Sequence, residues 1–396
     1  MENNGQKNGY RNIILLSAVS FFNDLSSEII MPILPMFLQS LGATGEIIGL
    51  VGGLRESISS ILKVVCGYWS DKTGKRKVFV YAGYATSTLF KVLLAFSRVW
   101  QSAVAFSSLE RVGKGLRTAA RDAIIAESIT TQRGKAFGVH RAVETVGAIL
   151  GAFAAFMLFW FFGMKFGSII FVAAVAGVAS LIPLYFVRET GSPPRQNVAI
   201  KLGIGTLPGP LRLFIVIAGI FALGEFSYMF FVMRVQHFFE GRLAVAAPIL
   251  LYVLFNIFYS ALAVPFGIIS DKIGRVKVIM FGYLMFSVTS VGFIFADSLW
   301  VFVLLFAIYG VMFAAIDGNQ RAFVSDLAGQ NLKATALGTF HTVTGFAALP
   351  AGLIAGFLWE NISPAATFIY GGVLSSAAVC LFVGLQGRLY QQPKQS

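Results

Sequence analysis

Two carboxylates lie inside the first long apolar stretch of the sequence, FFNDLSSEIIMPILP at residues 21–35. Asp24 and Glu28 are spaced by one turn of a helix. An ionisable side chain at the centre of a bilayer costs about 2.5–3.5 kcal/mol to insert, so it faces protein or water. A carboxylate next to a movable cation can take up a proton when that cation leaves. The chemistry that these two positions suggest is therefore proton transfer.

Other charged residues interrupt later apolar stretches, and most of the cations among them lie in the first half of the sequence. Buried cations need counter-charge, so this surplus predicts an anionic or zwitterionic solute. The candidate proton carriers are Asp24, Glu28 and Glu110, and the candidate solute-binding residues are Arg55, Arg111, Lys114 and Glu225.

A second interpretation treats the same charges as internal ion pairs that hold helices in register. Glu110 and Lys114, for example, are one helical turn apart. Acids and bases that satisfy each other need no solute. We expect one of Asp24 and Glu28 to be a structural partner of this kind and the other to carry protons.

The spacing around the two acids places them on one side of a helix. Polar residues and a methionine follow steps of three and four, which is the repeat of one helical face. This pattern predicts a polar seam that faces the interior of the protein. Its members are Ser17, Ser20, Asp24, Ser27, Glu28 and Met31.

The composition indicates which elements must hold these residues. Hydrophobic residues make up 57% of the chain and charged residues 12%, whereas soluble domains have about 25% charged residues. One span needs about 20 apolar residues, so this is predicted to be an all-α membrane protein with twelve spans. We expect them at residues 12–38, 45–69, 78–97, 101–123, 135–162, 166–187, 211–238, 246–269, 277–296, 299–323, 334–358 and 364–385.

Basic residues are concentrated in alternate connections between the expected spans. SDKTGKRK at 70–77 and SDKIGRVK at 270–277 are rich in Lys and Arg, and the connections on the other side have almost none. The positive-inside rule therefore predicts that both termini are cytoplasmic. The same distribution indicates that the basic residues behind the net charge of +13 lie beside the lipid, so the charge does not indicate nucleic-acid binding. A polar linker at 188–210 separates an expected N-terminal bundle, 1–187, from a C-terminal bundle, 211–396.

The two halves repeat each other. The stretch that begins GYWSDKTGK at Gly67 recurs as GIISDKIGR at Gly267, 200 residues later, and the same offset pairs Arg121 with Arg321. A repeat of this length indicates a six-span unit that is duplicated in the same membrane orientation.

The repeated loop resembles a motif of the major facilitator superfamily, in which Gly, Asp and a cluster of basic residues follow span two. The resemblance covers almost the whole chain and implies two six-helix bundles with alternating access. It implies that Asp71 pairs across its bundle, with Arg117 or Arg121 as partner. Val276 departs from the motif, so weaker contacts are expected in the second loop. The residues expected to form the gate are Gly67, Asp71, Lys72, Gly74, Lys75, Arg76, Arg117, Arg121, Gly267, Asp271, Lys272, Gly274 and Arg275.

Two further stretches bear on coupling. Residues 111–115 resemble the Arg-x-x-x-Gly element that the family associates with protons, and Ala152 replaces the Pro of its antiporter motif. The stretches NDLSSE and ERVGKGLRTAARDAIIAES resemble a bacterial and archaeal branch of the family. The resemblance thus implies a proton-coupled secondary transporter of a small polar solute. Proton-driven efflux of drugs, metabolites or siderophores is the alternative.

Other classes of protein are not indicated. The sequence has three His, no HExxH motif, no Gly-rich phosphate loop and no Cys pair, so we expect neither an enzyme nor a cofactor or metal. A channel is disfavoured because the duplicated gate loops suit rocking halves. The expected partners are the solute, protons and the lipid bilayer, and we expect a monomer in the plasma (bacterial inner) membrane.

Overall fold

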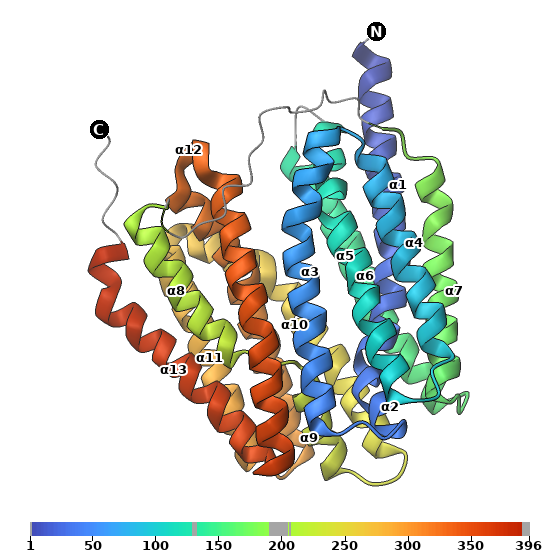
Figure 1. The fold of residues 1–396 in the computed structure, drawn as a ribbon, viewed down its shortest axis with the longest axis vertical. Helices are drawn as coiled ribbons and strands as arrows, with labels where there is room; N and C mark the ends of the chain where they lie inside the picture. The colour runs from blue at the N-terminus through green and yellow to red at the C-terminus, as the bar shows by residue number, and fades with distance from the viewer. Residues whose placement is uncertain (1, 129–132, 190–204, 206, 390–396) are drawn as a thin grey trace. The chain divides into compact units, whose positions relative to one another are not determined.

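The structure of the chain is a computed structural model that describes residues 2–128, 133–189, 205 and 207–389. Within these ranges the regular elements are helices (Figure 1). The first part of the chain forms α1 (Glu2–Ile30), the short 3-10 turn η1 (Met31–Ile33), α2 (Leu34–Ser40), α3 (Gly45–Thr73), α4 (Arg76–Ala95), α5 (Trp100–Ser128), α6 (Arg133–Trp160) and α7 (Phe166–Tyr185). The second part forms α8 (Gly209–Gly224), α9 (Met229–Phe238), α10 (Leu243–Ile273), α11 (Arg275–Phe295), α12 (Leu299–Asn361) and α13 (Pro364–Leu389).

The helices account for the twelve expected spans. The described residues contain ten helical stretches that are long and apolar enough to cross a membrane. In that set α1 and α2 form one stretch, α8 and α9 form another, and α12 divides at Gly329, whose φ of 65° breaks the helix. The remaining two expected spans are α3 and α5, each 29 residues long but interrupted by charges. The expected all-α fold with twelve spans is therefore confirmed.

The chain forms two compact units. Unit 1 comprises residues 1–43 and 58–199, and unit 2 comprises residues 44–57 and 200–396. The first turns of α3 thus group with unit 2, although they precede the expected boundary at residue 187. Most of the expected linker, 188–210, lies outside the described residues.

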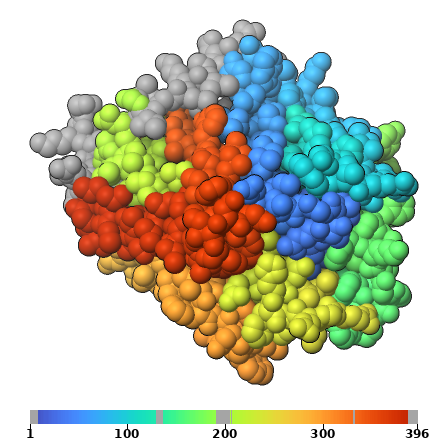
Figure 2. Space-filling view, turned by 60° about the horizontal axis from the view of Figure 1, so that its bottom comes forward, coloured from blue at the N-terminus to red at the C-terminus, as the bar shows by residue number. Residues whose placement is uncertain are grey.

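Within unit 1, α1 packs against α6 and α7, and α4 packs against α5 and α7. Within unit 2, α8 packs against α12 and α13 (Figure 2). Each unit therefore has its own helical packing.

The α-helix of the first span is interrupted by a 3-10 turn just after its acidic residues. Pro32 lies in the 3-10 turn and Pro35 is in the first turn of α2. Proline cannot donate the backbone hydrogen bond of a helix interior, so the regular helix ends at Ile30. Asp24 and Glu28 therefore lie in the last two turns of α1.

Glycines bring α4 and α5 into backbone contact. A Cβ atom added to Gly113 would lie 2.3 Å from the Gly83 carbonyl oxygen and 2.4 Å from Ser87 Oγ. Small residues allow this close approach between membrane helices, where packing is a main source of association. The contact fixes the depth at which the charged residues of α4 and α5 face α1.

Replacing Gly113 by Ala is expected to destabilise unit 1 by at least about 1–3 kcal/mol, because backbone atoms must move to admit one methyl group. Thermal unfolding of the purified protein in detergent measures the effect. Gly138→Ala on α6 is the control, since its added Cβ would have nothing within 4 Å. Equal melting temperatures for the two variants would contradict the close contact.

Candidate functional site

The predicted polar seam of α1 faces the interior of unit 1. Ser17 and Ser20 are buried, and Asp24, Ser27 and Glu28 are half-buried. Asn23 and Ser26, which lie beside this seam, are also buried. Since the seam faces α4, α5 and α6 and carries their polar contacts, the sequence located the polar face of the first span correctly.

Asp24 has few direct contacts. Its carboxylate accepts one hydrogen bond, from Asn23 Nδ2 at 3.2 Å. Within the described residues it has no ion-pair partner within 4 Å. Charged side chains surround it at longer range: Glu144, Arg117, Arg121 and Lys114. Asp24 is therefore an acid in a cationic environment without a bound counter-ion.

Glu28 differs from Asp24, because it has an interaction of its own within the protein. The expectation that one of the two acids has a structural partner is thus compatible with Glu28 in that role.

Lys91 on α4 supplies a fully buried cation opposite the same segment of α1. Its Nζ donates to Ser27 Oγ at 2.9 Å, Ser26 Oγ at 3.0 Å and the Asn23 carbonyl oxygen at 3.4 Å. These acceptors are all neutral. A buried ammonium group held only by neutral acceptors lacks the compensation that a carboxylate would give.

Three candidate residues, Glu110, Arg111 and Lys114, lie on α5 of unit 1. Arg111 is buried, with its Nε 3.3 Å from Glu110 Oε2 and its Nη2 3.0 Å from Met31 Sδ. Glu110 is also buried, whereas Lys114 is exposed. The structure thus brings Arg111 to the end of α1 and pairs Glu110 with a neighbouring cation.

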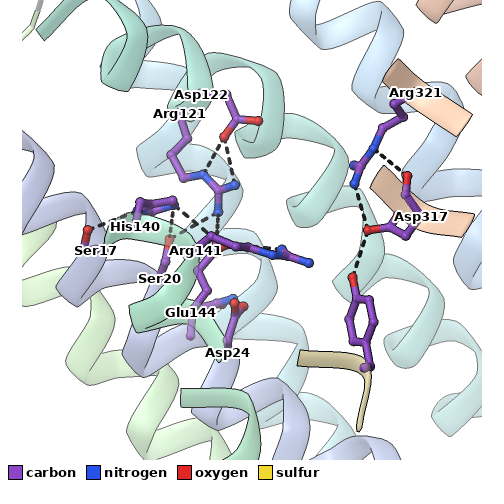
Figure 3. A network of polar contacts seen from close by, with 12 residues as sticks. Ser17, Ser20, Asp24, Arg121, Asp122, His140, Arg141, Glu144, Asp317 and Arg321 are labelled. Atoms are coloured by element: carbon purple, nitrogen blue, oxygen red, sulfur yellow. Dashed lines mark hydrogen bonds and ion pairs between the residues drawn. The ribbon is translucent and has the colours of Figure 1, made fainter. Parts of the chain in front are cut away.

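A second group of charges connects α5 to α6 (Figure 3). Arg121 Nη1 donates to Glu144 Oε1 at 2.5 Å and to Ser20 Oγ at 3.2 Å. Its other nitrogens donate to Asp122 Oδ1 at 2.9 and 3.0 Å. Arg141 reaches Glu144 Oε2 at 3.3 Å from a more exposed position. Arg121 therefore has a buried carboxylate partner within its own unit.

His140 ties this group to α1. Its Nε2 lies 3.2 Å from Glu144 Oε1, and its Nδ1 lies 3.2 Å from Ser17 Oγ. The hydroxyl of Ser20 contacts Tyr84 at 3.0 Å. One continuous set of polar contacts thus joins α1, α4, α5 and α6.

The remaining two candidates lie in unit 2. Arg55 is buried in the first turns of α3. Glu225 ends α8 at the non-helical residues that separate it from α9, with φ −80° and ψ 78°. In the described chain its carboxylate has no hydrogen bond or ion pair, and its charged neighbours are Glu56 and Asp317. Arg55 and Glu225 therefore belong to unit 2, whereas the other candidate proton-carrying and solute-binding residues belong to unit 1.

The first gate loop contradicts the expected pairing of Asp71. Arg76 Nη2 binds Asp71 Oδ1 at 3.2 Å, and Arg76 also pairs with Glu127. Arg117 instead donates to Ser87 Oγ at 2.7 Å, and Arg121 binds Glu144 as described above. The prediction of an Asp71 pair with Arg117 or Arg121 was wrong, because an arginine five residues away reaches the same carboxylate.

The glycines of the two loops differ in their roles. Gly74 and Gly274 have φ of 68° and 99°, which favour glycine. Gly67 packs closely on α5, since an added Cβ would lie 3.0 Å from Ala119 Cβ, but Gly267 has nothing within 4 Å. The close-contact role therefore holds only for the first copy.

The second loop keeps its ion pairs despite Val276. Arg275 Nη2 binds Asp271 Oδ1 at 3.1 Å, and Arg275 also pairs with Asp326. The basic residue that clamps this loop thus precedes the motif position by one. The expectation of weaker contacts at Val276 did not take account of Arg275, which forms both of these ion pairs.

Sequence reasoning did not select His140, Glu144 or Lys91 as site residues. His140 and Glu144 are one helical turn apart in an apolar stretch, the same signal that singled out Asp24 and Glu28. Lys91 is the sole charge inside the expected third span, 78–97. Applying the cost of burying charge to every span would have identified all three.

Comparison with known proteins agrees with this architecture. The family model described as Major Facilitator Superfamily matches residues 16–247 and 243–395. An uncharacterized MFS-type transporter of Methanocaldococcus jannaschii is 51% identical over 393 residues, covering 96% of this chain and 98% of that protein. Multidrug resistance protein MdtG of a Rahnella species is 27% identical over 190 residues, covering 46% of this chain and 45% of MdtG.

A solved structure shows the same fold. The crystal structure of nucleoside transporter NupG matches with a TM-score of 0.77 at 15% identity, covering 94% of this chain and 99% of NupG. The family model and the archaeal relative each span most of the sequence. The chain therefore belongs to the major facilitator superfamily and is a transporter, an integral protein of the plasma membrane.

Proposed function

We propose that this transporter moves a small anionic or zwitterionic solute by alternating access, and that movement of the solute is coupled to protons through Asp24. The observation that carries the proposal is the isolation of the Asp24 carboxylate, which has one neutral hydrogen-bond donor and no ion-pair partner among the described residues. An acid that is not held by a cation can bind and release a proton without breaking an ion pair. Glu28 is the structural acid in this scheme.

The proposed solute site uses the cations on the helices next to α1. Lys91 is held by neutral acceptors, and Arg111 lies at the end of α1. Lys114 is exposed and is an electrostatic neighbour of Asp24. An anionic group near Lys91 supplies the counter-charge that a buried ammonium group held by neutral acceptors lacks. It also makes proton loss from Asp24 less favourable, which links the two bound species.

In unit 2 we assign Arg55 and Glu225 to solute binding, because both are charged residues at expected membrane depth. Glu110 is a weaker candidate for proton transfer than Asp24, since it pairs with Arg111. We propose that the loops around Asp71 and Asp271 act as gates. The protein is proposed to act as a monomer of two six-helix bundles in a bacterial inner membrane, without a catalytic role.

Proton-driven efflux is the second candidate. The similarity to MdtG, which covers about half of each chain, favours it. Accumulation of ethidium by cells that express the protein distinguishes the two, because an efflux antiporter lowers accumulation and a proton-coupled importer of polar solutes leaves it unchanged.

The experiment that tests coupling uses purified protein in liposomes that contain the pH dye pyranine. Dialanine, succinate and uridine serve as zwitterionic, anionic and neutral probes. We expect dialanine or succinate to cause saturable proton movement and uridine to cause none. Protein-free liposomes are the control. Saturable flux of a charged probe without any change in internal pH would contradict proton coupling.

A further inference from the structure

A cavity of about 860 Å³ lies at one end of unit 1, away from the charged seam. It is formed by α2, the end of α4 and the connection from α6 to α7. The surfaces of α2, in blue, and of the α6–α7 connection, in green, meet at this end (Figure 2). The lining is mainly apolar and includes five phenylalanines, Phe37, Phe96, Phe159, Phe166 and Phe171. Its volume is within the range of small-molecule sites.

One wall of the cavity is electropositive. Lys165 is exposed and immediately precedes the 20-residue helix α7, and both line the cavity. The first intrahelical bond of α7 is donated by the Ile169 N–H to the Lys165 carbonyl. The N–H groups of residues 166–168 therefore have no helical acceptor, and a helix N-terminus attracts anions.

Ser97 is a second and independent feature. It lines the same cavity from the end of α4 and is only 8% exposed. Within the described residues its hydroxyl oxygen has no hydrogen-bond partner. Leaving a buried hydroxyl unpaired costs about 1–3 kcal/mol, so a ligand that accepts a hydrogen bond from it is stabilised.

We propose that this cavity binds an anionic phospholipid from the bilayer. The phosphate accepts hydrogen bonds from the first turn of α7 and from the Ser97 hydroxyl, and it is neutralised by Lys165. One acyl chain lies along the aromatic lining. The ring centroids of Phe96 and Phe171 lie 5.7 Å apart in an edge-to-face contact. Both side chains are exposed, so the lining continues onto the outer surface of unit 1.

Two arguments favour a lipid over a soluble anion. The lining combines a few polar residues, Ser40, Ser97, Lys165 and Ser168, with a mostly apolar remainder, as an amphipathic ligand requires. The connection between the fifth and sixth spans also lies at the extracytoplasmic end of unit 1 by the positive-inside rule. The cavity therefore lies at the level where lipid phosphates meet the hydrocarbon region.

The test compares dioleoyl phosphatidylglycerol with dioleoyl phosphatidylcholine as ligands of the purified protein, with binding measured by native mass spectrometry. We expect phosphatidylglycerol to bind more tightly, and Lys165→Glu to weaken its binding by about fivefold or more while phosphatidylcholine binding changes little. Ser97→Ala should weaken phosphatidylglycerol binding in the same direction.

Controls separate the site from general charge effects and from misfolding. Arg242→Glu changes a cation in another connection between spans, at the start of α10, and should leave lipid selectivity unchanged. Each variant must retain the wild-type melting temperature in the lipid-free state. Inorganic phosphate and dihexanoyl phosphatidylglycerol provide two further arms. Equal binding of both dioleoyl lipids by the wild type, full selectivity in Lys165→Glu, or tight binding of phosphate alone would overturn the proposal.

Discussion

Replacing Asp24 by Asn is expected to abolish the proposed proton-driven accumulation of solute, while exchange of solute across the membrane should continue. The amide keeps the size of the side chain and can keep its contact with Asn23, but it cannot carry a proton at neutral pH. Accumulation of radiolabelled dialanine or succinate under a pH gradient should fall to the level of protein-free liposomes. The rate of counterflow without a gradient should stay within about a factor of two of the wild-type rate. This corresponds to a change of less than ~0.5 kcal/mol in the activation free energy of transport.

Two variants make this result specific. Glu28→Gln removes the neighbouring acid. It is expected to lower the melting temperature of the protein and to leave proton-driven accumulation of solute largely intact. Asp297→Asn makes the same chemical change at an exposed position between two spans of unit 2 and should have no effect. If Asp24→Asn still accumulates solute with wild-type dependence on the gradient, Asp24 does not carry the coupled proton.

Removing Arg121 has the second large expected effect. Arg121→Gln removes the buried guanidinium partner of Glu144 and leaves it, among the described residues, only His140 and the exposed Arg141. Breaking a buried pair by removing one partner costs about 3–5 kcal/mol. Glu144→Gln should cost less, because Arg121 keeps Asp122 and Ser20 as acceptors. The double variant Arg121→Gln with Glu144→Gln should be more stable than Arg121→Gln alone. Thermal or denaturant unfolding in detergent micelles gives the three values.

Arg141 provides the matched control for this cycle. It contacts the same carboxylate at 3.3 Å, but its side chain is 60% exposed, compared with 13% for Arg121. Exposed ion pairs contribute about 0–1 kcal/mol, so Arg141→Gln should change stability very little. Strictly additive effects of the Arg121 and Glu144 substitutions would show that the two residues do not act as a pair.

The sequence was sufficient for features that depend on local pattern. Hydropathy and the positions of Lys and Arg predicted the spans, and steps of three and four predicted the polar face of α1. Both patterns reflect the cost of placing polar groups in hydrocarbon, which applies residue by residue. The assignment of the family followed from the duplicated loop, whose residues are close together in the chain.

Pairings between helices could not be predicted in the same way. Arg117 and Arg121 lie one turn apart on α5, and both were possible partners of Asp71. Arg117 donates to Ser87 in the closely packed α4–α5 contact, and Arg121 binds Glu144 on α6. Which partner a charge finds depends on how neighbouring helices are rotated, and spacing within one helix carries no information about that.

The break between α8 and α9 was also beyond the sequence. The non-helical residues between α8 and α9 contain no proline, and an added Cβ at Gly224 would lie 2.7 Å from Leu374 Cβ on α13. A contact between helices far apart in the sequence therefore constrains the chain at this point. The candidate Glu225 could be named from its charge, but its position at the end of a helix could not.

The two gate loops bear on how relatives of this protein should be aligned. Arg76 and Arg275 are 199 residues apart, and so are their second partners, Glu127 and Asp326, although the surrounding repeat has an offset of 200. The arginine and its distant acid have thus shifted together by one column. A position-by-position alignment of the two halves would record Val276 as a lost contact, whereas the clamp has only changed register. In homologous sequences, a basic residue in either column should be scored together with the acid that accompanies it.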